Sequence, residues 1–179
     1  MAMTLITTNI HTGDSDATSD FTSSIDSTYK LYIFKFIDIN PATDNVNFEF
    51  QANAVGASGY NETMTTTAFG AYHYEDDSTL ALAYAGNEDQ AQGTAFQQLA
   101  YEVGNGADES CAGTLWLFNP SSTTYVKHFY SRVNNYGYTD RSIDIYIAGY
   151  FNTTTAIDDI QFKMSSGNFD GTIKMYGVG

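Results

Sequence analysis

The sequence predicts an all-β protein, built as an antiparallel sandwich or barrel of about ten short strands. Three observations predict this class. Apolar and polar residues alternate with a period of two in several segments, turn signals recur about every 8–12 residues, and no segment has a convincing helical pattern. The 14 Tyr and 12 Phe residues, together with many Thr and Ile, also favour strands over helices.

Residues 27–52 are expected to form the centre of the fold. The run at residues 29–39 is apolar at almost every position, which predicts a strand covered on both faces. The run at residues 46–52 alternates Val, Phe, Phe and Ala with Asn, Glu and Gln, so it should bury one face and expose the other. Residues 40–45 are predicted to form the turn between them.

The other elements follow from the same signals. Residues 4–8 are predicted to be an edge strand, residues 11–20 a polar, acidic surface loop, and residues 134–137 a turn. Residues 96–103 fit a helical face and also a strand, and the flanking glycines and β context favour the strand. Residues 114–118, TLWLF, have the pattern of a buried strand. Further strands are predicted at residues 21–25, 65–74, 80–84, 124–133, 143–151, 157–164 and 172–178.

These elements predict two parts of the chain. Residues 1–20 are expected to be an N-terminal arm, or an edge strand with a loop. Residues 21–179 are expected to be a single β-sandwich domain, because a chain of 179 residues suits one domain.

The net charge of −14, from 21 acidic and 7 basic residues, predicts no binding to nucleic acid, because phosphates would be repelled. We interpret the charge mainly as a source of solubility, with Ca²⁺ binding as the alternative. No apolar run reaches about 18 residues, so no membrane span and no membrane partner are expected. The first ten residues do not have the pattern of a secretory signal, which predicts either no export by that route or release by lysis.

The residues typical of enzymes are not grouped in the sequence. His11, His73 and His128 lie on separate predicted elements, so neither a zinc site nor an acid–base site is expected. Cys111 follows an acidic residue by two positions, which should raise its pKa and leave it unreactive. We therefore predict that the protein is not an enzyme and has no catalytic, cofactor-binding or metal-binding residues and no cofactor.

Two groups of acidic residues are candidates for a functional site. Asp14, Asp16 and Asp20 resemble a Ca²⁺ loop in part, but the glycine and glutamate that such a loop needs are missing, which favours turn residues. Asp158 and Asp159 are adjacent, so on a strand they would point to opposite faces and would not form the carboxylate pair of a glycosidase.

Four tyrosines are candidates for a binding surface: Tyr136, Tyr138, Tyr146 and Tyr150. An exposed Tyr can stack on a sugar ring, and Tyr is also enriched at protein interfaces. Contact between subunits is the favoured interpretation, and sugar binding is the alternative.

Three segments carry distinctive strand and turn motifs: residues 29–50, residues 113–120 and residues 160–178. Together they resemble virion proteins of tailed bacteriophages. Residues 29–50 are similar to that family's strand, Pro-Ala-Thr-Asp turn and alternating strand, with the turn at residues 41–44. Residues 113–120 match its Gly-x-Leu-x-Leu-x-Asn-Pro pattern, and residues 160–178 its ending with a Ser-Gly-Asn turn and Gly-Thr-Ile-x-x-Tyr-Gly. The resemblance implies a jelly-roll, lectin-like β-sandwich used as a fibre, tail-accessory or capsid-decoration module, and it brings no catalytic residue.

The resemblance thus implies a non-enzymatic structural protein located in the virion. A long fibre would need a coiled-coil or repetitive stalk, so a compact capsid decoration or tail-accessory subunit fits the sequence better. The expected partners are further copies of the chain, in a homo-oligomer such as a trimer, and virion proteins such as the major capsid or tail proteins. The alternative is a carbohydrate-binding or receptor-binding module with a host surface glycan as its ligand.

Overall fold

The computed structural model describes residues 2–179, and within them the chain forms twelve β-strands and no helix. All pairings between the strands are antiparallel. The predicted all-β antiparallel class is confirmed, whereas the predicted number of about ten strands was too low. The strands are β1 (Met3–Asp16), β2 (Thr18–Phe21), β3 (Leu31–Pro41), β4 (Val46–Ala54), β5 (Met64–Tyr74), β6 (Leu80–Tyr84), β7 (Gln97–Val103), β8 (Cys111–Phe118), β9 (Lys127–Gly137), β10 (Arg141–Phe151), β11 (Ile157–Met164) and β12 (Phe169–Val178).

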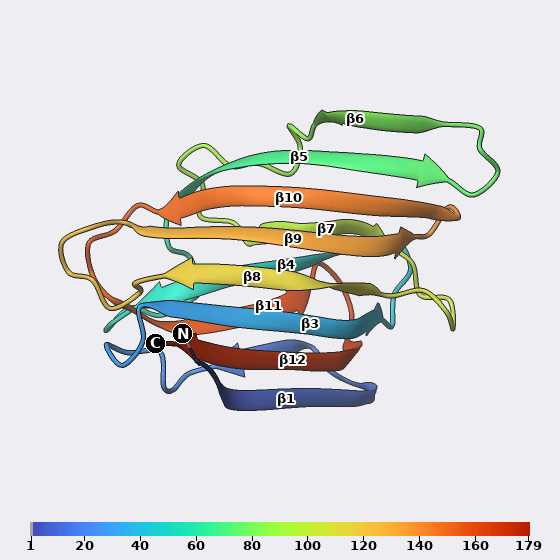
Figure 1. Cartoon of the computed structure of the whole chain (residues 1–179). Helices are drawn as coiled ribbons and strands as arrows, with labels where there is room; N and C mark the ends of the chain where they lie inside the picture. The colour runs from blue at the N-terminus through green and yellow to red at the C-terminus, as the bar shows by residue number, and fades with distance from the viewer. Residues whose placement is uncertain (1) are drawn as a thin grey trace.

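The strands form one sheet that curls into a nearly closed barrel (Figure 1). Its front consists of β1, β12, β3, β8, β9, β10, β5 and β6, in that order. The strands β7, β4, β11 and β2 lie behind this front (Figure 1). On one side, β7 joins front to back by a single pair with β9, Val103↔Gly137. On the other side, no backbone pairing among residues 2–179 links β1 to β2. The Asn9 side chain bridges this gap, because its Nδ2 donates to Ser19 Oγ at 3.0 Å and to the carbonyl of Asp20 at 3.1 Å.

The core between front and back is built largely from phenylalanine rings. Phe162 of β11 lies at its centre and is fully buried. Its ring centroid is within 5.2–6.2 Å of those of Phe21, Phe34, Phe36, Phe48 and Phe50. Because Phe34 and Phe36 belong to the front and the other rings to the back, this cluster holds the two layers together.

The central pair of strands matches its prediction in part. Val46, Phe48, Phe50 and Ala52 are buried, as the alternation in β4 predicts. The expectation that β3 is covered on both faces was wrong, because Ile37 on its outer side is 39% exposed and no second layer of the described chain covers that side. The outer side of β3 is therefore open at Ile37, although Ile33 on the same side is only 8% exposed.

The predicted N-terminal loop was also wrong. Residues 11–16 continue β1 along β12, and residues 18–21 form β2 along β11. His11 is 8% exposed, because its ring packs on Phe169 at 4.8 Å and its Nδ1 lies 2.9 Å from Asp16 Oδ2. Backbone pairing with neighbouring strands outweighs the polar composition of this segment.

Three smaller predictions have clear outcomes. Residues 96–103 are a strand, as favoured, since β7 spans Gln97–Val103. The predicted turn at residues 134–137 was wrong, because β9 runs to Gly137 and the chain turns at residues 138–140. The predicted strand at residues 21–25 was wrong beyond Phe21, where β2 ends.

Candidate binding face

The outward positions of β5, β8, β9 and β10 form a continuous surface on the front, which we call the outer face. Residues directly opposite each other in neighbouring strands share a face, and the pairs Phe69↔Tyr146, Tyr146↔Arg132 and Arg132↔Thr114 carry this surface across all four strands. Its members are Thr65, Thr67, Phe69, Ala71, His73, Ala112, Thr114, Trp116, Phe118, His128, Tyr130, Arg132, Asn134, Tyr136, Ser142, Asp144, Tyr146, Ala148 and Tyr150.

Aromatic side chains cover the centre of the outer face. Trp116 stacks on Tyr130 with the ring centroids 4.6 Å apart, and Phe118 lies 5.4 Å from the same Tyr130 ring. Phe69 stacks on Tyr146 at 4.8 Å. Tyr130 is 43% exposed and Phe69 is 48% exposed. Large half-exposed rings gathered on one surface are typical of a binding site for a protein or a ligand.

Arg132 is bonded to Asp144 and lies over one of these rings, that of Tyr146. Its Nε and Nη2 donate to the Asp144 carboxylate at 3.1 and 2.8 Å, and its guanidinium carbon lies 4.9 Å from the centre of the Tyr146 ring. The hydrogen bond to Asp144 and the negative charge of that residue raise the pKa of Arg132. A guanidinium fixed in this way would lose little side-chain entropy when it binds a partner.

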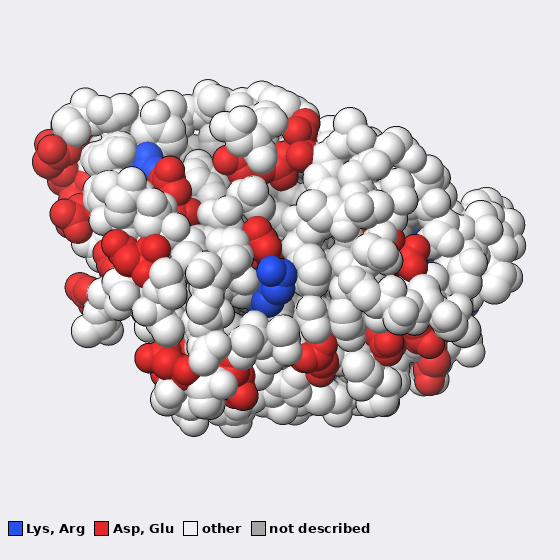
Figure 2. All heavy atoms as spheres, turned by 180° about the vertical axis from the view of Figure 1, so that it is seen from behind, with Lys and Arg blue, Asp and Glu red and all other residues white. Residues whose placement is uncertain are grey.

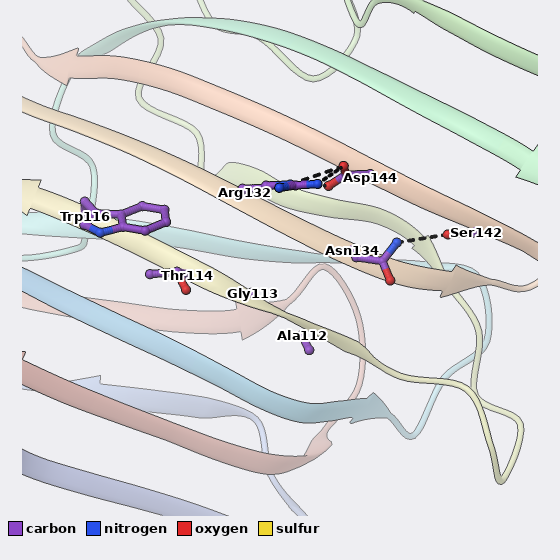
Figure 3. A pocket seen from close by; sticks show the side chains of 8 residues that line it. All are labelled: Ala112, Gly113, Thr114, Trp116, Arg132, Asn134, Ser142 and Asp144. Carbon is purple, nitrogen blue, oxygen red and sulfur yellow. Dashed lines mark hydrogen bonds and ion pairs between the residues drawn. The ribbon is translucent and has the colours of Figure 1, made fainter.

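A hollow of about 440 Å³ opens beside Trp116 (Figure 3). Asn134 forms part of its wall, and its Nδ2 donates to Ser142 Oγ at 3.0 Å and to the carbonyl of Ile143 at 2.8 Å. The hollow therefore joins an indole ring to an amide, a carboxylate and a guanidinium in fixed positions. It is lined by Ala112, Gly113, Thr114, Trp116, Arg132, Asn134, Ser142 and Asp144.

The outer face is poor in negative charge. Across β5, β6, β8, β9 and β10, which are fully described, Asp144 is the single acidic residue, although the chain has 21. Acidic side chains are spread over the back of the molecule, with far fewer Lys and Arg among them (Figure 2). The four back strands alone carry Asp20, Glu49, Glu102, Asp158 and Asp159.

Part of this surface was predicted from the sequence. Tyr136, Tyr146 and Tyr150 lie on the outer face, and Tyr138 lies in the turn that follows β9. The rings of Trp116 and Phe118 were missed, because TLWLF was interpreted as a fully buried strand. The signal that could have found them is the alternation itself, since Trp116 and Phe118 are two positions apart and so lie opposite the buried Leu115 and Leu117.

The structure does not bring the histidines together. His73 lies opposite Ser142 and His128 opposite Tyr150. These two partners are eight residues apart on β10, or about 27 Å at a rise of about 3.4 Å per residue. His11 lies on β1. In the part of the chain that is described, no three His, Cys, Asp or Glu side chains are arranged to hold a metal ion.

Cys111 and the acidic residues that the sequence offers as candidate sites are not members of the outer face. Cys111 is 1% exposed, and burial, rather than its acidic neighbours, raises the pKa of its thiol. Asp16 binds His11, and Asp20 accepts a hydrogen bond from Gln161 Nε2 at 2.6 Å. Asp158 has a raised pKa, caused first by burial and then by the charge of Asp159.

Comparisons of the chain with protein-family models, with curated proteins and with solved structures found no match. Across residues 2–179, no helix is long and apolar enough to cross a membrane. The outer face is therefore the surface for which we propose a function.

Proposed function

We propose that this chain is a non-enzymatic structural protein of a tailed-phage virion, a capsid decoration or tail-accessory subunit that binds through its outer face. One observation carries the proposal: a protein of net charge −14 has one sheet surface that is rich in half-exposed aromatic rings and holds a single carboxylate. Such a surface gains free energy when a partner covers it. The acidic remainder keeps the subunit soluble before it docks.

The fold supports this role. We propose a jelly-roll-like β-sandwich, because β3 pairs with β12, β4 with β11 and β5 with β10, so that early strands pair with late ones in nested order. The phenylalanine cluster between front and back supports the description as two packed layers. Jelly rolls are a recurrent architecture of viral capsid domains.

The residue types on the outer face suit contact with protein. Trp, Tyr and Arg carry a large part of the binding energy at protein interfaces. Trp116, Tyr130, Arg132 and Tyr146 are neighbours here, and their contacts with each other hold the rings in place. The partners in this proposal are further copies of the chain and virion proteins such as the major capsid or tail proteins.

The test uses tailed particles produced from the genome that carries this sequence. Mass spectrometry of gradient-purified particles should detect the chain as a stoichiometric component, and antibodies raised against it should label intact particles. Its absence from purified particles would overturn the proposal.

Matched variants test the surface itself. Tyr130→Ser should weaken binding of the purified chain to particles that lack it by at least about tenfold. Val55→Ser is the control, because Val55 is 55% exposed and follows β4, a strand at the back of the molecule. Equal binding by both variants would exclude the outer face as the docking surface.

The hollow favours a second candidate, a carbohydrate-binding or receptor-binding module for a host surface glycan. Sugar sites combine an aromatic ring with planar polar side chains, as Trp116 does with Asn134 and Asp144. A glycan array probed with and without a chelator separates the two functions. Specific binding that disappears in Trp116→Ser and Asn134→Ala supports the module, and no specific sugar is expected for the structural subunit.

A further inference from the structure

The strand β6 is an open edge of the front. Within the described chain it pairs with β5 alone, in a register without irregularities. Its five residues, LALAY, include no proline and no charge. Natural proteins normally protect exposed edge strands with prolines, charges or bulges. An edge that has none of these is suited to the addition of another strand.

The hydrogen bonds of β5 and β6 show which backbone groups are free. At one end of the ladder, Tyr74 N donates to the carbonyl of Thr79, and at the other end, Ala85 N donates to the carbonyl of Ala68. Bonded and non-bonded pairs alternate in an antiparallel ladder. The residues whose N–H and C=O groups point away from β5 are therefore Leu80, Leu82 and Tyr84.

The exposure of the apolar side chains at this edge also indicates that a neighbouring strand is missing. Leu80, Leu82 and Tyr84 are 67%, 75% and 61% exposed. The opposite edge of the front, β1, shows the same property, with Leu5 52% and Ile10 67% exposed. The direct cross-strand pairs show that the exposed residues of β6 and those of β1 lie on the same, outward side of the front.

Charge decides which edges fit each other. Acidic residues flank β6 on both sides, at residues 75–77 and 88–89. Two β6 strands paired antiparallel would bring the start of one strand beside the end of the other, and the like charges would repel. In β1, the stretch from Met3 to His11 has no acidic residue, and Lys174 lies opposite Thr8 on the neighbouring strand. Asp14 and Asp16 follow this stretch, so a β1 edge beside β6 brings acidic residues together at one end only, whereas two β6 strands bring them together at both ends.

We propose that β6 of one copy adds to β1 of a second copy, so that the fronts of successive copies continue head to tail. The regular stretch of β1 between its two irregularities, Thr7–His11, has five residues, as many as β6. A contact between two different edges of the same chain generates a ring or a filament. This inference rests on the self-association in the proposed function, but not on the location in a virion.

Cross-linking of purified single-cysteine variants tests the pairing. Leu82→Cys places a thiol on β6, Thr8→Cys places one on β1, and the native Cys111 is buried. With a short bis-maleimide, a mixture of the two variants should give mainly the mixed product. Leu82→Cys linked to itself at least as efficiently would overturn the head-to-tail arrangement in favour of paired β6 strands.

Sedimentation velocity tests association without a reagent. The purified chain should associate at concentrations up to about 0.1 mM, and Leu82→Pro should weaken this by at least about tenfold, because it removes an N–H from the open edge and no bond to β5. Leu82→Ala keeps the N–H and should lose less. Lys174→Glu reverses the charge beside β1 and should weaken association even if the proline variant does not fold.

The outcomes separate this inference from the proposed function. A chain that stays monomeric at the highest concentration overturns the edge contact, whether or not it is found in particles. A chain that associates through β6 and β1 but is absent from purified particles overturns the virion proposal and leaves the edge contact standing.

Discussion

The rings of Phe69 and Tyr146 lie parallel on the outer face, with centroids 4.8 Å apart and an interplanar angle of 3°. They come from neighbouring strands and face each other directly. Phe69 is 48% exposed, so much of its surface stays in water. An aromatic cross-strand pair of this kind contributes about 0.2–1 kcal/mol to folding. Its arrangement is better explained by a contact that covers it than by the stability of the isolated chain.

Phe69→Ser should therefore affect binding and folding differently. The free energy of unfolding, measured with urea, should fall by no more than about 1–2 kcal/mol, because only a half-exposed ring is lost. Binding to particles should fall by at least about tenfold. A loss of stability that matches a core mutation, or unchanged binding, would contradict this assignment.

For Phe162 we predict a large effect on stability, in contrast to the small effect predicted for Phe69. It is fully buried and contacts rings from both layers, so Phe162→Ala leaves a cavity that joins them. The free energy of unfolding should fall by about 3–5 kcal/mol. Phe162→Leu retains more of the volume and should cost less. A change below about 1 kcal/mol for the alanine variant would show that the cluster does not hold the layers together.

Strands with a clean period of two could be predicted closely from the sequence. Ile143, Ile145 and Ile147 of β10 are buried as the alternation predicts. Residues 157–164 are β11 with the predicted bounds, and its alternating residues Ile160, Phe162 and Met164 are buried, after an irregularity between Ile157 and Asp159. In these strands one face is apolar and the other polar, so a shift of one residue would expose the whole apolar set. The alternating pattern therefore predicts both that the segment is a strand and which of its two faces points to the core.

The errors have two physical causes. The polar segment at residues 11–20 becomes strand because β12 and β11 offer backbone partners, and a single sequence shows nothing of that pairing. In residues 29–39 and 114–118, apolar side chains occupy both faces. Such a pattern looks the same whether the chain covers its second face itself or leaves that face open, as it does at Ile37 and Trp116. For this reason the alternation in TLWLF indicates that Trp116 and Phe118 share one face of a strand, but it does not indicate that this face stays open.

Gly171 should tolerate no side chain. Its φ is +131°, and a Cβ there would lie 2.7 Å from the carbonyl oxygen of Asp38, where β12 passes an irregularity in β3. Gly171→Ala should lower the free energy of unfolding by about 1–3 kcal/mol or more. Gly86→Ala is the matched control, since its Cβ would meet nothing closer than 3.7 Å and should change stability little. Equal effects of the two variants would contradict the strain argument.

Cys111 should resist modification in the folded protein. The thiol is 1% exposed and burial raises its pKa, so the reactive thiolate is both rare and inaccessible. Labelling with a thiol reagent should be slow in buffer and fast in denaturant. Thr123→Cys adds a thiol at an exposed position and should label at once, which shows that the reagent is active. Fast labelling of Cys111 without denaturant would mean that β8 opens readily.

Alkaline pH should destabilise the fold through Tyr60. Burial, followed by the charges of Asp20 and Asp159, raises the pKa of Tyr60 from 10.0 to about 12. Between these values the unfolded chain has lost a proton that the folded chain still holds. The stabilisation from this residue is therefore complete below pH 10 and is lost as the pH rises towards 12.

The measurement is the free energy of unfolding as a function of pH from about 9 to 11.5. The loss should be less steep in Tyr60→Phe, which has no phenolic proton to lose. Asp159→Asn should give an intermediate slope, because it removes one of the charges that raise the pKa of Tyr60. Tyr136 also has its pKa raised to about 12, by burial first and then by a hydrogen bond to Glu75, so the loss should become still less steep in the double variant with Tyr136→Phe. A slope in Tyr60→Phe equal to that of the unchanged chain would show that this phenol ionises alike in both states.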